Sequence, residues 1–512
     1  MDRKKVIIFG TAKRGSEVLA ILSQLPQYEA AAFSCNDEAL WGMEKEGLGI
    51  IAPADMRRLH PGAAVVIASA SYMEIETQLA DGQLLPDAGC LRMERLIGEL
   101  SDEEKAALSA RVQRETCFYN LDYKEVRVPP EPDTGEKYLV ICTGGYPSAA
   151  SPRCMFAHER VLQYQRAGLK VEAFGLIEGA PFEEYEYQGV RVFQGGVLEL
   201  EEFLGGRNYR KYLVHFVCPD ILYAVDRAGK TDVPMIVWCH GYEVLPWYRC
   251  WFNYTKDERE NGAAALYKRD DEKRRFLRDI FERNQIHFIF VSAWEMDRSK
   301  KFVGTLPKNC CIIHNFIDHE FFALPEKKAE DRSRILSVKS HGTRMYANDL
   351  TAKAILELSK RECFADLTFE LYGDGVLFEE NFKELLERGF SNVHIYKRYL
   401  NHEEMRELFR ENGMFLSPTR SDAQGVTANE AMAAGMAVIS CNTSVIKEFM
   451  DESCASLFEY DNYWMMAEEI EYLYNHPDEF LEKAKNARER VVRQCGYDHT
   501  IRQELRLILD EA

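Results

Sequence analysis

The chain of 512 residues lacks several features that define common protein classes. No apolar run reaches the roughly 18 residues needed to cross a bilayer, so the sequence predicts no transmembrane helix. Positive charge is scarce, because 64 Lys and Arg stand against 83 Asp and Glu and leave a net charge of −19. That balance disfavours nucleic acid as a partner. The 14 cysteines form no CxxC motif, which argues against zinc fingers and disulfide frameworks and favours a reducing compartment.

The N-terminal sequence also bears on location. MDRKKVIIFG enters an apolar strand at once and leaves no room for a signal peptide. We therefore expect a cytoplasmic protein, one that can still contact the inner face of the membrane peripherally. Hydrophobic residues make up 46% of the chain, which is enough for a core in each of about three domains.

Strand and helix patterns alternate along the chain and predict an α/β protein of three successive units. Residues 1–100 have the pattern of a small Rossmann-like parallel domain. Residues 101–135 contain a charged helix and the proline-rich linker VPPEPDTG. Residues 136–330 and 331–512 form two larger blocks of short apolar strands, whose polar or glycine-bearing ends are where ligands collect in parallel sheets.

The first unit contains a glycine motif. Gly10 to Gly15 form GxAxxG, a relaxed version of the dinucleotide-binding fingerprint, and Asn36 and Asp37 follow the second strand where that fingerprint places an acid for a ribose. Two interpretations stay open. The motif binds a nucleotide, or its glycines serve only the turn from strand to helix.

The most informative stretch is GMFLSPTRSDAQGVTANEAMAAGMAVIS, which predicts a buried strand, a polar loop and a helix of small residues. A helix that begins near Val426 directs free amides and a positive dipole end into the loop, which favours phosphate. Glu430, one turn into the helix, can accept hydrogen bonds from two neighbouring sugar hydroxyls. The structural alternative is that Glu430 only caps the helix and Gly425 only turns the chain.

The spacing from Asp422 to Glu430, followed by EAMAAGMAVIS, resembles the Glu-x7-Glu signature of family-4 retaining glycosyltransferases of the GT-B fold. IIHNFID resembles the Asn-Gly-Ile-Asp turn of that family, LYGDG its glycine–aspartate–glycine strand end, and GGYPS its glycine-rich first loop. The motifs occur in the family's order over residues 136–512. The resemblance implies two facing Rossmann-like domains, here preceded by the small Rossmann-like domain.

The resemblance also implies roles for individual residues. Glu430 would hold the donor ribose, and Asp422 would lie near the transferred sugar as a catalytic residue. The amides of Gly425 and Val426 would face the diphosphate. The remaining donor-binding candidates from the glycine motifs are Gly145 and Gly373.

Two departures from the family pattern concern charge. Asp422 is one methylene shorter than the usual glutamate, and Arg420 lies two residues before it as a further donor-binding candidate. Tyr346 stands where the family has the lysine of its diphosphate clamp. The nearby cations are Arg344, our first choice for the clamp and for catalysis, and Lys339, our second. A cation is needed because the departing diphosphate develops negative charge.

A histidine and an aromatic segment complete the candidate site. His240 ends a strand, as a histidine often does in this family, and is predicted to contact the donor sugar or phosphate unless it is a core histidine. His215 and His314 are expected to be structural. Residues 245–254, LPWYRCWFNY, combine aromatics with Arg249, a composition that suits sugar stacking, a lipid interface or core packing. The acceptor-side candidates are Trp247, Trp251 and Glu243.

Together these features predict a retaining glycosyltransferase that moves a sugar from a UDP- or GDP-sugar to a saccharide or lipid-linked saccharide in surface polysaccharide biosynthesis. No metal or cofactor is expected, since the clamp and helix dipole replace a metal in this fold and no DxD motif ends a strand. One alternative is an epimerase or phosphorylase of the same architecture. Another is a non-catalytic scaffold that binds nucleotide sugars.

Overall fold

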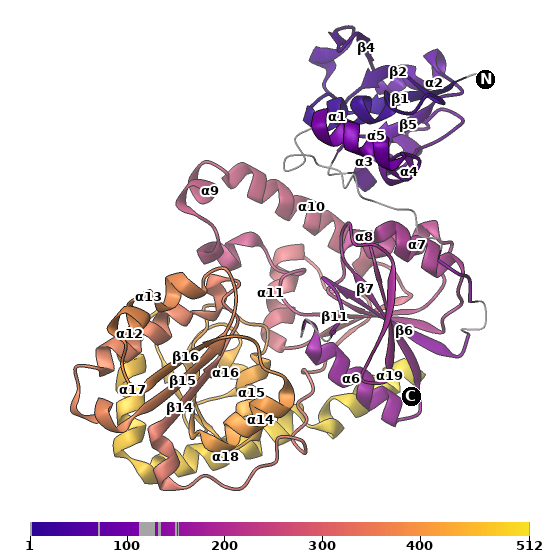
Figure 1. Cartoon of the computed structure of the whole chain (residues 1–512). Coiled ribbons are helices and arrows are strands. Elements are labelled where there is room, and N and C mark those ends of the chain that lie inside the picture. Colours follow the sequence, from indigo (N-terminus) through magenta and orange to yellow (C-terminus); the bar gives the residue numbers. More distant parts are fainter. Residues whose placement is uncertain are drawn as a thin grey trace. The chain divides into compact units, whose positions relative to one another are not determined.

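The computed structural model describes residues 3–69, 72–111, 128–131, 135–148, 151 and 153–510 (Figure 1). The chain divides into two compact units. The first comprises Met1–Pro129, Glu178–Glu183 and Gly195–Phe203, and the second comprises Pro130–Ile177, Glu184–Gln194 and Leu204–Ala512. Much of the predicted linker 101–135 lies outside the described residues. Within the described part, no helix is both long and apolar enough to cross a membrane.

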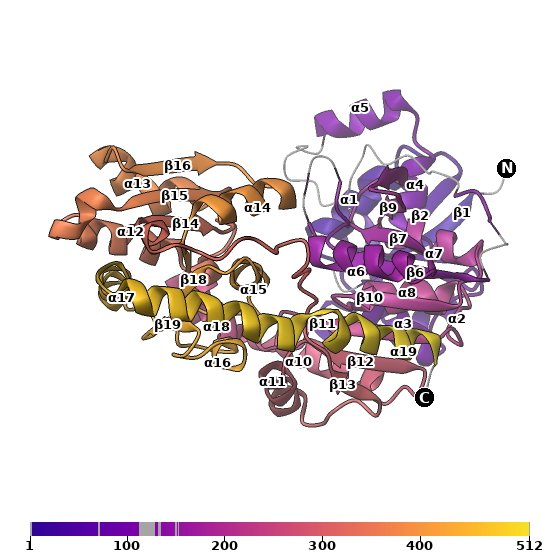
Figure 2. The same ribbon diagram turned by 90° about the horizontal axis from the view of Figure 1, so that it is seen from below.

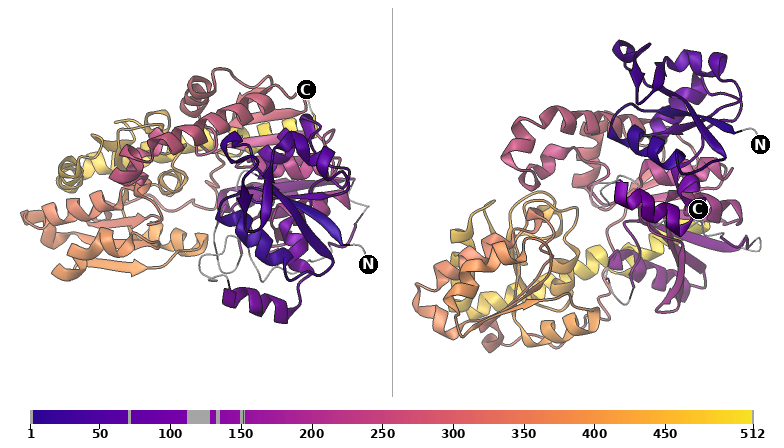
Figure 3. Two further views of the ribbon diagram at one scale, coloured as in Figure 1. Left: turned by 90° about the horizontal axis from the view of Figure 1, so that it is seen from above. Right: turned by 45° about the horizontal axis from the view of Figure 1, so that its top comes forward.

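The first unit has a five-stranded sheet in the order β3-β4-β2-β1-β5. Its strands are β1 (Lys4–Phe9), β2 (Tyr28–Ser34), β3 (Glu44–Lys45), β4 (Leu48–Ile51) and β5 (Ala64–Ile67), and its helices are α1 (Lys13–Leu22), α2 (Pro53–Leu59), α3 (Tyr72–Asp81), α4 (Met93–Gly98) and α5 (Asp102–Arg111). β1 pairs in parallel with β2 and β5, and β2 with β4, whereas β3 and β4 are antiparallel. Val6 and Ile8 pack into one core, while Ile7 and Phe9 pack into another, so helices cover both faces of the sheet (Figure 3).

The second unit begins with an eight-stranded sheet in the order β13-β12-β11-β10-β6-β7-β9-β8. Its strands are β6 (Lys137–Thr143), β7 (Lys170–Leu176), β8 (Glu183–Tyr187), β9 (Val190–Gly195), β10 (Lys211–His215), β11 (Met235–Cys239), β12 (Ile286–Phe290) and β13 (Cys310–Ile312). Its helices are α6 (Met155–Arg166), α8 (Pro219–Arg227), α9 (Lys256–Glu260), α10 (Ala263–Phe281) and α11 (Ala293–Val303), with the 3₁₀ helix η3 (Trp247–Asn253). The helix α7 (Val197–Gly205), which follows β9, belongs for most of its length to the first unit. The neighbouring strands β6, β10, β11, β12 and β13 of this sheet pair in parallel.

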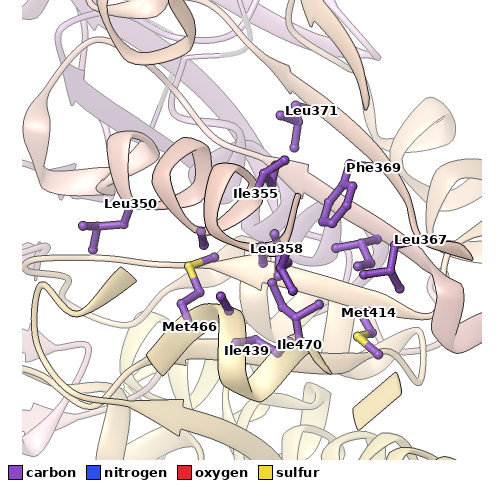
Figure 4. Packing of buried hydrophobic residues seen from close by; sticks show 14 of the residues in the cluster. Leu350, Ile355, Leu358, Leu367, Phe369, Leu371, Met414, Ile439, Met466 and Ile470 are labelled. Carbon is purple, nitrogen blue, oxygen red and sulfur yellow. The ribbon is translucent and has the colours of Figure 1, made fainter. Parts of the chain in front are cut away.

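A six-stranded parallel sheet follows, in the order β16-β15-β14-β17-β18-β19. Its strands are β14 (Arg334–Val338), β15 (Thr368–Gly373), β16 (Val393–Lys397), β17 (Met414–Ser417), β18 (Ala437–Cys441) and β19 (Ala455–Phe458). Its helices are α12 (Asn348–Leu358), α13 (Phe378–Arg388), α14 (His402–Glu411), α15 (Val426–Ala433), α16 (Ile446–Phe449), α17 (Tyr463–Asn475) and α18 (Pro477–Cys495). Figure 4 shows side chains of α12, β15, β18 and α17 converging in the core on one face of this sheet.

The last helix departs from the predicted domain boundary. α19 (Ile501–Leu509) lies within the predicted 331–512 domain, but Ile501 and Ile508 pack into the core of the eight-stranded sheet. Its buried Glu504 accepts hydrogen bonds from Arg160 and Trp238, both at 2.9 Å. Figure 2 shows α18 and α19 running in succession from the six-stranded sheet to the eight-stranded sheet. By its packing, α19 therefore belongs with residues 136–330.

Candidate functional site

The turn before α15 is closed by Asp422. Its Oδ1 atom accepts hydrogen bonds from the amides of Ala423, Gln424 and Gly425 at 2.8, 3.2 and 2.9 Å. Gly425 has a φ of +82°, which favours glycine, and it precedes the first residue of α15, Val426. The Gly425 amide, predicted to face a diphosphate, is thus engaged by Asp422 in this structure, while Oδ2 of Asp422 makes no hydrogen bond to a described residue.

Glu430 lies in α15 with only 7% of its surface exposed. Burial raises the pKa of its carboxyl to about 7, although the charges of His402 and Lys339 act in the opposite direction. An acid that burial disfavours this strongly needs cationic neighbours to remain ionised. Such perturbed groups are typical of functional sites.

Lys339 supplies one of these cations. It follows β14 and is itself buried, with 7% of its surface exposed. Burial lowers the pKa of the ammonium, and the carboxylates of Asp422 and Glu430 oppose that shift. Its Nζ lies 5.5 Å from the ring centroid of Tyr346, whose pKa is raised to about 12 by burial and by the charge of Asp422. The lysine, the two acids and the tyrosine therefore form one electrostatic cluster.

The two clamp candidates have different surroundings in the structure. Arg344, predicted as the first choice, has a half-exposed guanidinium that pairs with Glu380 of α13 at 2.9 Å. Lys339, the second choice, is the cation that lies with Asp422 and Glu430. A short loop that turns at Thr343 separates the two positions, and the sequence pattern does not show which cation faces inward.

Arg420 is also placed differently from the prediction that it binds the donor. Its guanidinium forms a fork with Asp349 at 2.8 and 2.9 Å, contacts Asp461 at 2.7 Å and donates to the carbonyl of Arg344 at 2.9 Å. Nε adds a hydrogen bond to Asp461 at 2.8 Å. An arginine has five N–H donors, and these contacts use them, so none is left for a phosphate. Arg420 instead joins the loop to α12.

His402 was not singled out by the sequence, yet it contacts the central acid. Its Nε2 lies 3.5 Å from Oε1 of Glu430, and its Nδ1 lies 3.1 Å from Oε1 of Glu159 in α6. The only local signal is that His402 opens a helix capped by Asn401, which does not point to a site. Because Glu159 is more than 200 residues away in sequence, only the fold reveals this triad.

His240 lies at the end of β11, as predicted, and pairs with a second histidine. Its Nε2 lies 3.0 Å from Nδ1 of His215, and burial holds the pKa of both rings well below the ordinary histidine value. His240 is therefore neutral, and its Nδ1 makes no hydrogen bond to a described residue. A Cβ built on the next residue, Gly241, would lie 3.5 Å from the Cβ of Ala423, so this loop packs against the Asp422 turn.

Glu243 orders that loop rather than projecting from it. Its Oε1 accepts a hydrogen bond from the His240 amide at 2.6 Å, and the side chain is buried with 7% exposed. Burial raises the pKa of Glu243 to about 7. The predicted acceptor-side role suits an exposed group better than this buried one. His314 also has a local partner, with Nδ1 2.8 Å from the carbonyl oxygen of Val291, which agrees with an ordering role for that histidine.

At two of the predicted donor-binding glycines, Gly145 and Gly373, a larger side chain would come too close to its neighbours. Gly145 follows β6 with a φ of +106°, and a Cβ there would lie 3.1 Å from Ile177. Gly373 ends β15, and a Cβ there would lie 1.9 Å from the carbonyl oxygen of Lys339. Gly373 therefore lets the Lys339 backbone pass close to the strand end.

The two predicted acceptor-side tryptophans differ. Trp247 is partly buried, and its ring makes edge contacts with Tyr254 and Tyr267 at centroid distances of 5.6 and 5.5 Å. Trp251 is 45% exposed, and Arg259 lies over its ring. Other exposed aromatic side chains between residues 242 and 267 are Tyr242, Tyr248 and Tyr267. Packing therefore accounts for Trp247 but not for Trp251.

The glycine motif of the first unit has structural partners. A Cβ on Gly15 would lie 2.1 Å from the carbonyl oxygen of Gly10, so α1 packs directly against the end of β1. Asn36 exchanges two hydrogen bonds with Gln78, and Asp37 caps a short 3₁₀ helix through the Ala39 amide. These contacts fit the turn interpretation of the motif.

Among the residues that the structure describes, no three or more His, Cys, Asp or Glu side chains lie together in a group that could hold a metal ion.

Comparisons with known families match two parts of the chain. Residues 332–476 match the model of glycosyl transferases group 1, and residues 2–84 match the model described as C2185-like, N-terminal. The search of curated proteins found no match.

Solved structures resemble the larger part of the chain. Sucrose-phosphate synthase from Thermosynechococcus elongatus aligns with a TM-score of 0.57 at 15% identity, covering 73% of this chain and 98% of that one. Alr3699/HepE from Anabaena, in complex with UDP-glucose, aligns with a TM-score of 0.53 at 13% identity, covering 73% and 100%. A glycosyltransferase from Rickettsia africae aligns with a TM-score of 0.51 at 13% identity, with the same coverage.

These findings define the class of fold. The chain has the GT-B architecture preceded by a further α/β domain, which confirms the predicted fold class. Residues 332–476, which match the model of glycosyl transferases group 1, include Lys339, Asp422 and Glu430 of the cluster.

Proposed function

We propose that this protein is a retaining glycosyltransferase that moves a sugar from a UDP- or GDP-sugar to a saccharide or lipid-linked saccharide in surface polysaccharide biosynthesis. The observation that carries the proposal is the cluster of buried Glu430 and Lys339 with partly exposed Asp422 beside the start of α15, within the residues that match the group 1 model. The likeness to a fold that holds UDP-glucose in HepE agrees with this choice of donor class.

In this proposal each charged group has a distinct task. The Glu430 carboxylate accepts hydrogen bonds from the two ribose hydroxyls. The Lys339 ammonium and the amide of Val426, at the positive end of α15, bind the diphosphate and stabilise the charge that it gains as the glycosidic bond breaks. Both groups bind the diphosphate before and during the reaction. Their attraction to it increases as it gains charge, so they stabilise the transition state more than the bound donor and accelerate the reaction.

The two carboxylate oxygens of Asp422 have different roles in this proposal, one in closing the turn and one in binding the sugar. Oδ1 holds the three amides of the turn, which fixes the direction of the carboxylate. Oδ2 is then available for a hydroxyl of the transferred sugar. Neutral His240, on the facing loop, offers Nδ1 to the same sugar. Neither residue needs to change its protonation state to do this.

The acceptor is proposed to approach the aromatic segment of residues 242–267. Its exposed Tyr242, Tyr248, Trp251 and Tyr267 suit stacking on sugar rings or contact with a lipid-linked precursor at the membrane surface. Trp251→Ala should weaken use of the acceptor and leave donor affinity unchanged. Trp247→Ala is the packing control, since it should lower the melting temperature. Equal loss of donor and acceptor binding in folded Trp251→Ala would contradict this placement.

The function is tested by screening nucleotide sugars. A donor that binds the native protein raises its melting temperature by mass action, and UDP-glucose and GDP-mannose are suitable first probes. Transfer requires that UDP or GDP be released faster with a saccharide acceptor than without one. Nucleotide release that no acceptor accelerates would contradict the proposal and favour an epimerase, phosphorylase or hydrolase.

One observation favours a second candidate, a scaffold that binds nucleotide sugars without transfer. Tyr346 replaces the lysine of the family's clamp and Arg344 faces Glu380, so Lys339 is left as the cation beside the acids. Tight nucleotide binding without turnover on any acceptor would favour this candidate.

A further inference from the structure

His402 sits between two carboxylates from different helices. Its Nδ1 lies 3.1 Å from Glu159 of α6, and its Nε2 lies 3.5 Å from Glu430 of α15. A neutral imidazole carries one N–H and can donate to only one carboxylate, whereas the protonated ring donates to both. The position of the ring between two carboxylates therefore favours the imidazolium.

The surroundings of the ring agree with that charge. His402 is largely buried, with 18% of its side chain exposed, and the rings of Phe321 and Phe322 lie 6.3 and 5.8 Å from it. The titratable groups around it are Glu159 and His158 from α6, Glu403 from α14 and Glu430 from α15, with Lys339 beyond Glu430. Acids outnumber bases in this set. Burial opposes the imidazolium, but the pair with Glu159 and the charge of Glu430 outweigh it and raise the pKa of His402 to about 9.

We propose that His402 is a positioning residue for donor binding, which orients Glu430 and favours its ionised form while Glu159 anchors the imidazole from the opposite segment. The inference rests on the proposed function for the role of Glu430 toward ribose. Without the charge of His402, burial would shift Glu430 further toward its protonated form, although Lys339 still opposes that shift. The neutral acid would lose the charge that strengthens its hydrogen bonds with the ribose hydroxyls.

The arrangement also links the two segments of the second unit. Glu159 comes from the segment of the eight-stranded sheet, and His402 and Glu430 come from that of the six-stranded sheet. The ionisation of Glu430 therefore depends on the two segments lying together, and a change in their separation would alter donor affinity through this chain of charges.

The first test measures the ionisation of Glu430 without any ligand. The infrared band of the protonated carboxyl is followed against pH in the full-length protein and assigned by its loss in Glu430→Gln. In His402→Gln the Glu430 band should persist to a higher pH than in the parent. A band that disappears at the same pH in both proteins would overturn the proposal.

The second test measures donor affinity by calorimetry between pH 6 and 9, with UDP-glucose and GDP-mannose as probes. His402→Gln should bind the active probe roughly tenfold more weakly near pH 7, and the loss should fade as rising pH ionises Glu430. Glu159→Gln removes the partner of His402 but also a negative charge that raises the pKa of Glu430, so these two effects oppose each other and the loss should be smaller than in His402→Gln. Glu403→Gln is the matched control, because it removes a neighbouring charge from the same helix without contacting the ring, and it should change affinity less than twofold.

The outcomes separate the two proposals. If neither probe binds but the Glu430 band moves in His402→Gln, the charge relationship stands and the proposed function fails. An affinity loss in His402→Gln that is independent of pH, with an unmoved band, would show that His402 only packs and would overturn the inference.

Discussion

Two glycine-bearing turns in this chain lead from a parallel strand into a helix, and they differ in what surrounds them. Before α1, the close approach of Gly15 to the carbonyl oxygen of Gly10 explains the glycine spacing. Before α15, Asp422 holds three amides, and the buried charges of Glu430 and Lys339 lie beside the turn. The same local pattern thus serves packing in one place and gathers charged groups in the other.

The difference shows why a glycine motif alone identifies nucleotide sites poorly. Glycine at a strand end allows the helix to approach the sheet, whether or not a ligand is present. Buried ionisable groups lower stability unless they are compensated, so their convergence points to function more strongly. The comparison predicts that substitutions at the α15 turn change donor affinity or turnover, whereas those at the α1 turn change the stability of the first unit.

The largest effect is expected at Asp422. Asp422→Asn keeps the shape of the side chain but removes the charge that faces the sugar, so turnover should fall roughly a hundredfold while donor affinity changes little. Asp422→Glu restores the family's usual residue but adds a methylene to a turn closed by three amides, so activity should fall as well. Initial rates and calorimetry on both variants check this. An unchanged rate in Asp422→Asn would remove Asp422 from the reaction.

Glu430→Gln should weaken donor binding tenfold to hundredfold, because hydrogen bonds to charged groups contribute about 1.5–3 kcal/mol. Binding as tight as the parent's would show that the ribose lies elsewhere.

The same variant should be more stable than the parent at pH 8. The folded-state pKa of Glu430, about 7, exceeds the ordinary value of 4.5, so ionisation costs stability as pH rises from 4.5 and the cost is complete above 7. Gln removes this cost, and denaturant unfolding should show a gain of about 2–3 kcal/mol at pH 8 and little gain at pH 4. A gain of equal size at both pH values would contradict the ionisation argument.

The two clamp candidates give a smaller, matched comparison. Lys339→Met should weaken binding of the nucleotide sugar about tenfold, since it removes the ammonium beside Asp422 and Glu430. Arg344→Met should change affinity less than twofold, because the guanidinium of Arg344 pairs with Glu380 at an exposed position. The reverse order of effects in calorimetry would identify Arg344 as the cation of the clamp.

The smallest effect on donor affinity is expected in the first unit. Gly15→Ala should lower the melting temperature of that unit, because its methyl group would meet the carbonyl of Gly10, and should leave donor affinity unchanged. Gly49→Ala is the control, since nothing lies within 4 Å of a Cβ at Gly49. Loss of donor affinity in folded Gly15→Ala would show that the α1 turn also takes part in donor binding.

Much of the fold follows from local sequence patterns. Short apolar strands that alternate with amphipathic helices predict parallel sheets. The strands at residues 4–9, 137–143 and 334–338 coincide with apolar runs in the sequence. The Asp422–Glu430 spacing likewise determines that one side chain closes the turn and the other lies on the helix that follows. These properties are local, because they depend on residues only a few positions apart.

Tertiary structure decided the rest. Packing against the eight-stranded sheet placed α19 outside its predicted domain, since amphipathicity shows that a helix buries a face but not against which partner. Arg344, Lys339 and Arg420 are equivalent as cations in sequence, and only burial and ion pairs determine which of them faces the acids. Glu159 of α6 and His402 of α14 lie close together because packing around the two sheets brings these helices together. Long-range electrostatics depends on distance in space, and that distance exists only once the chain has folded.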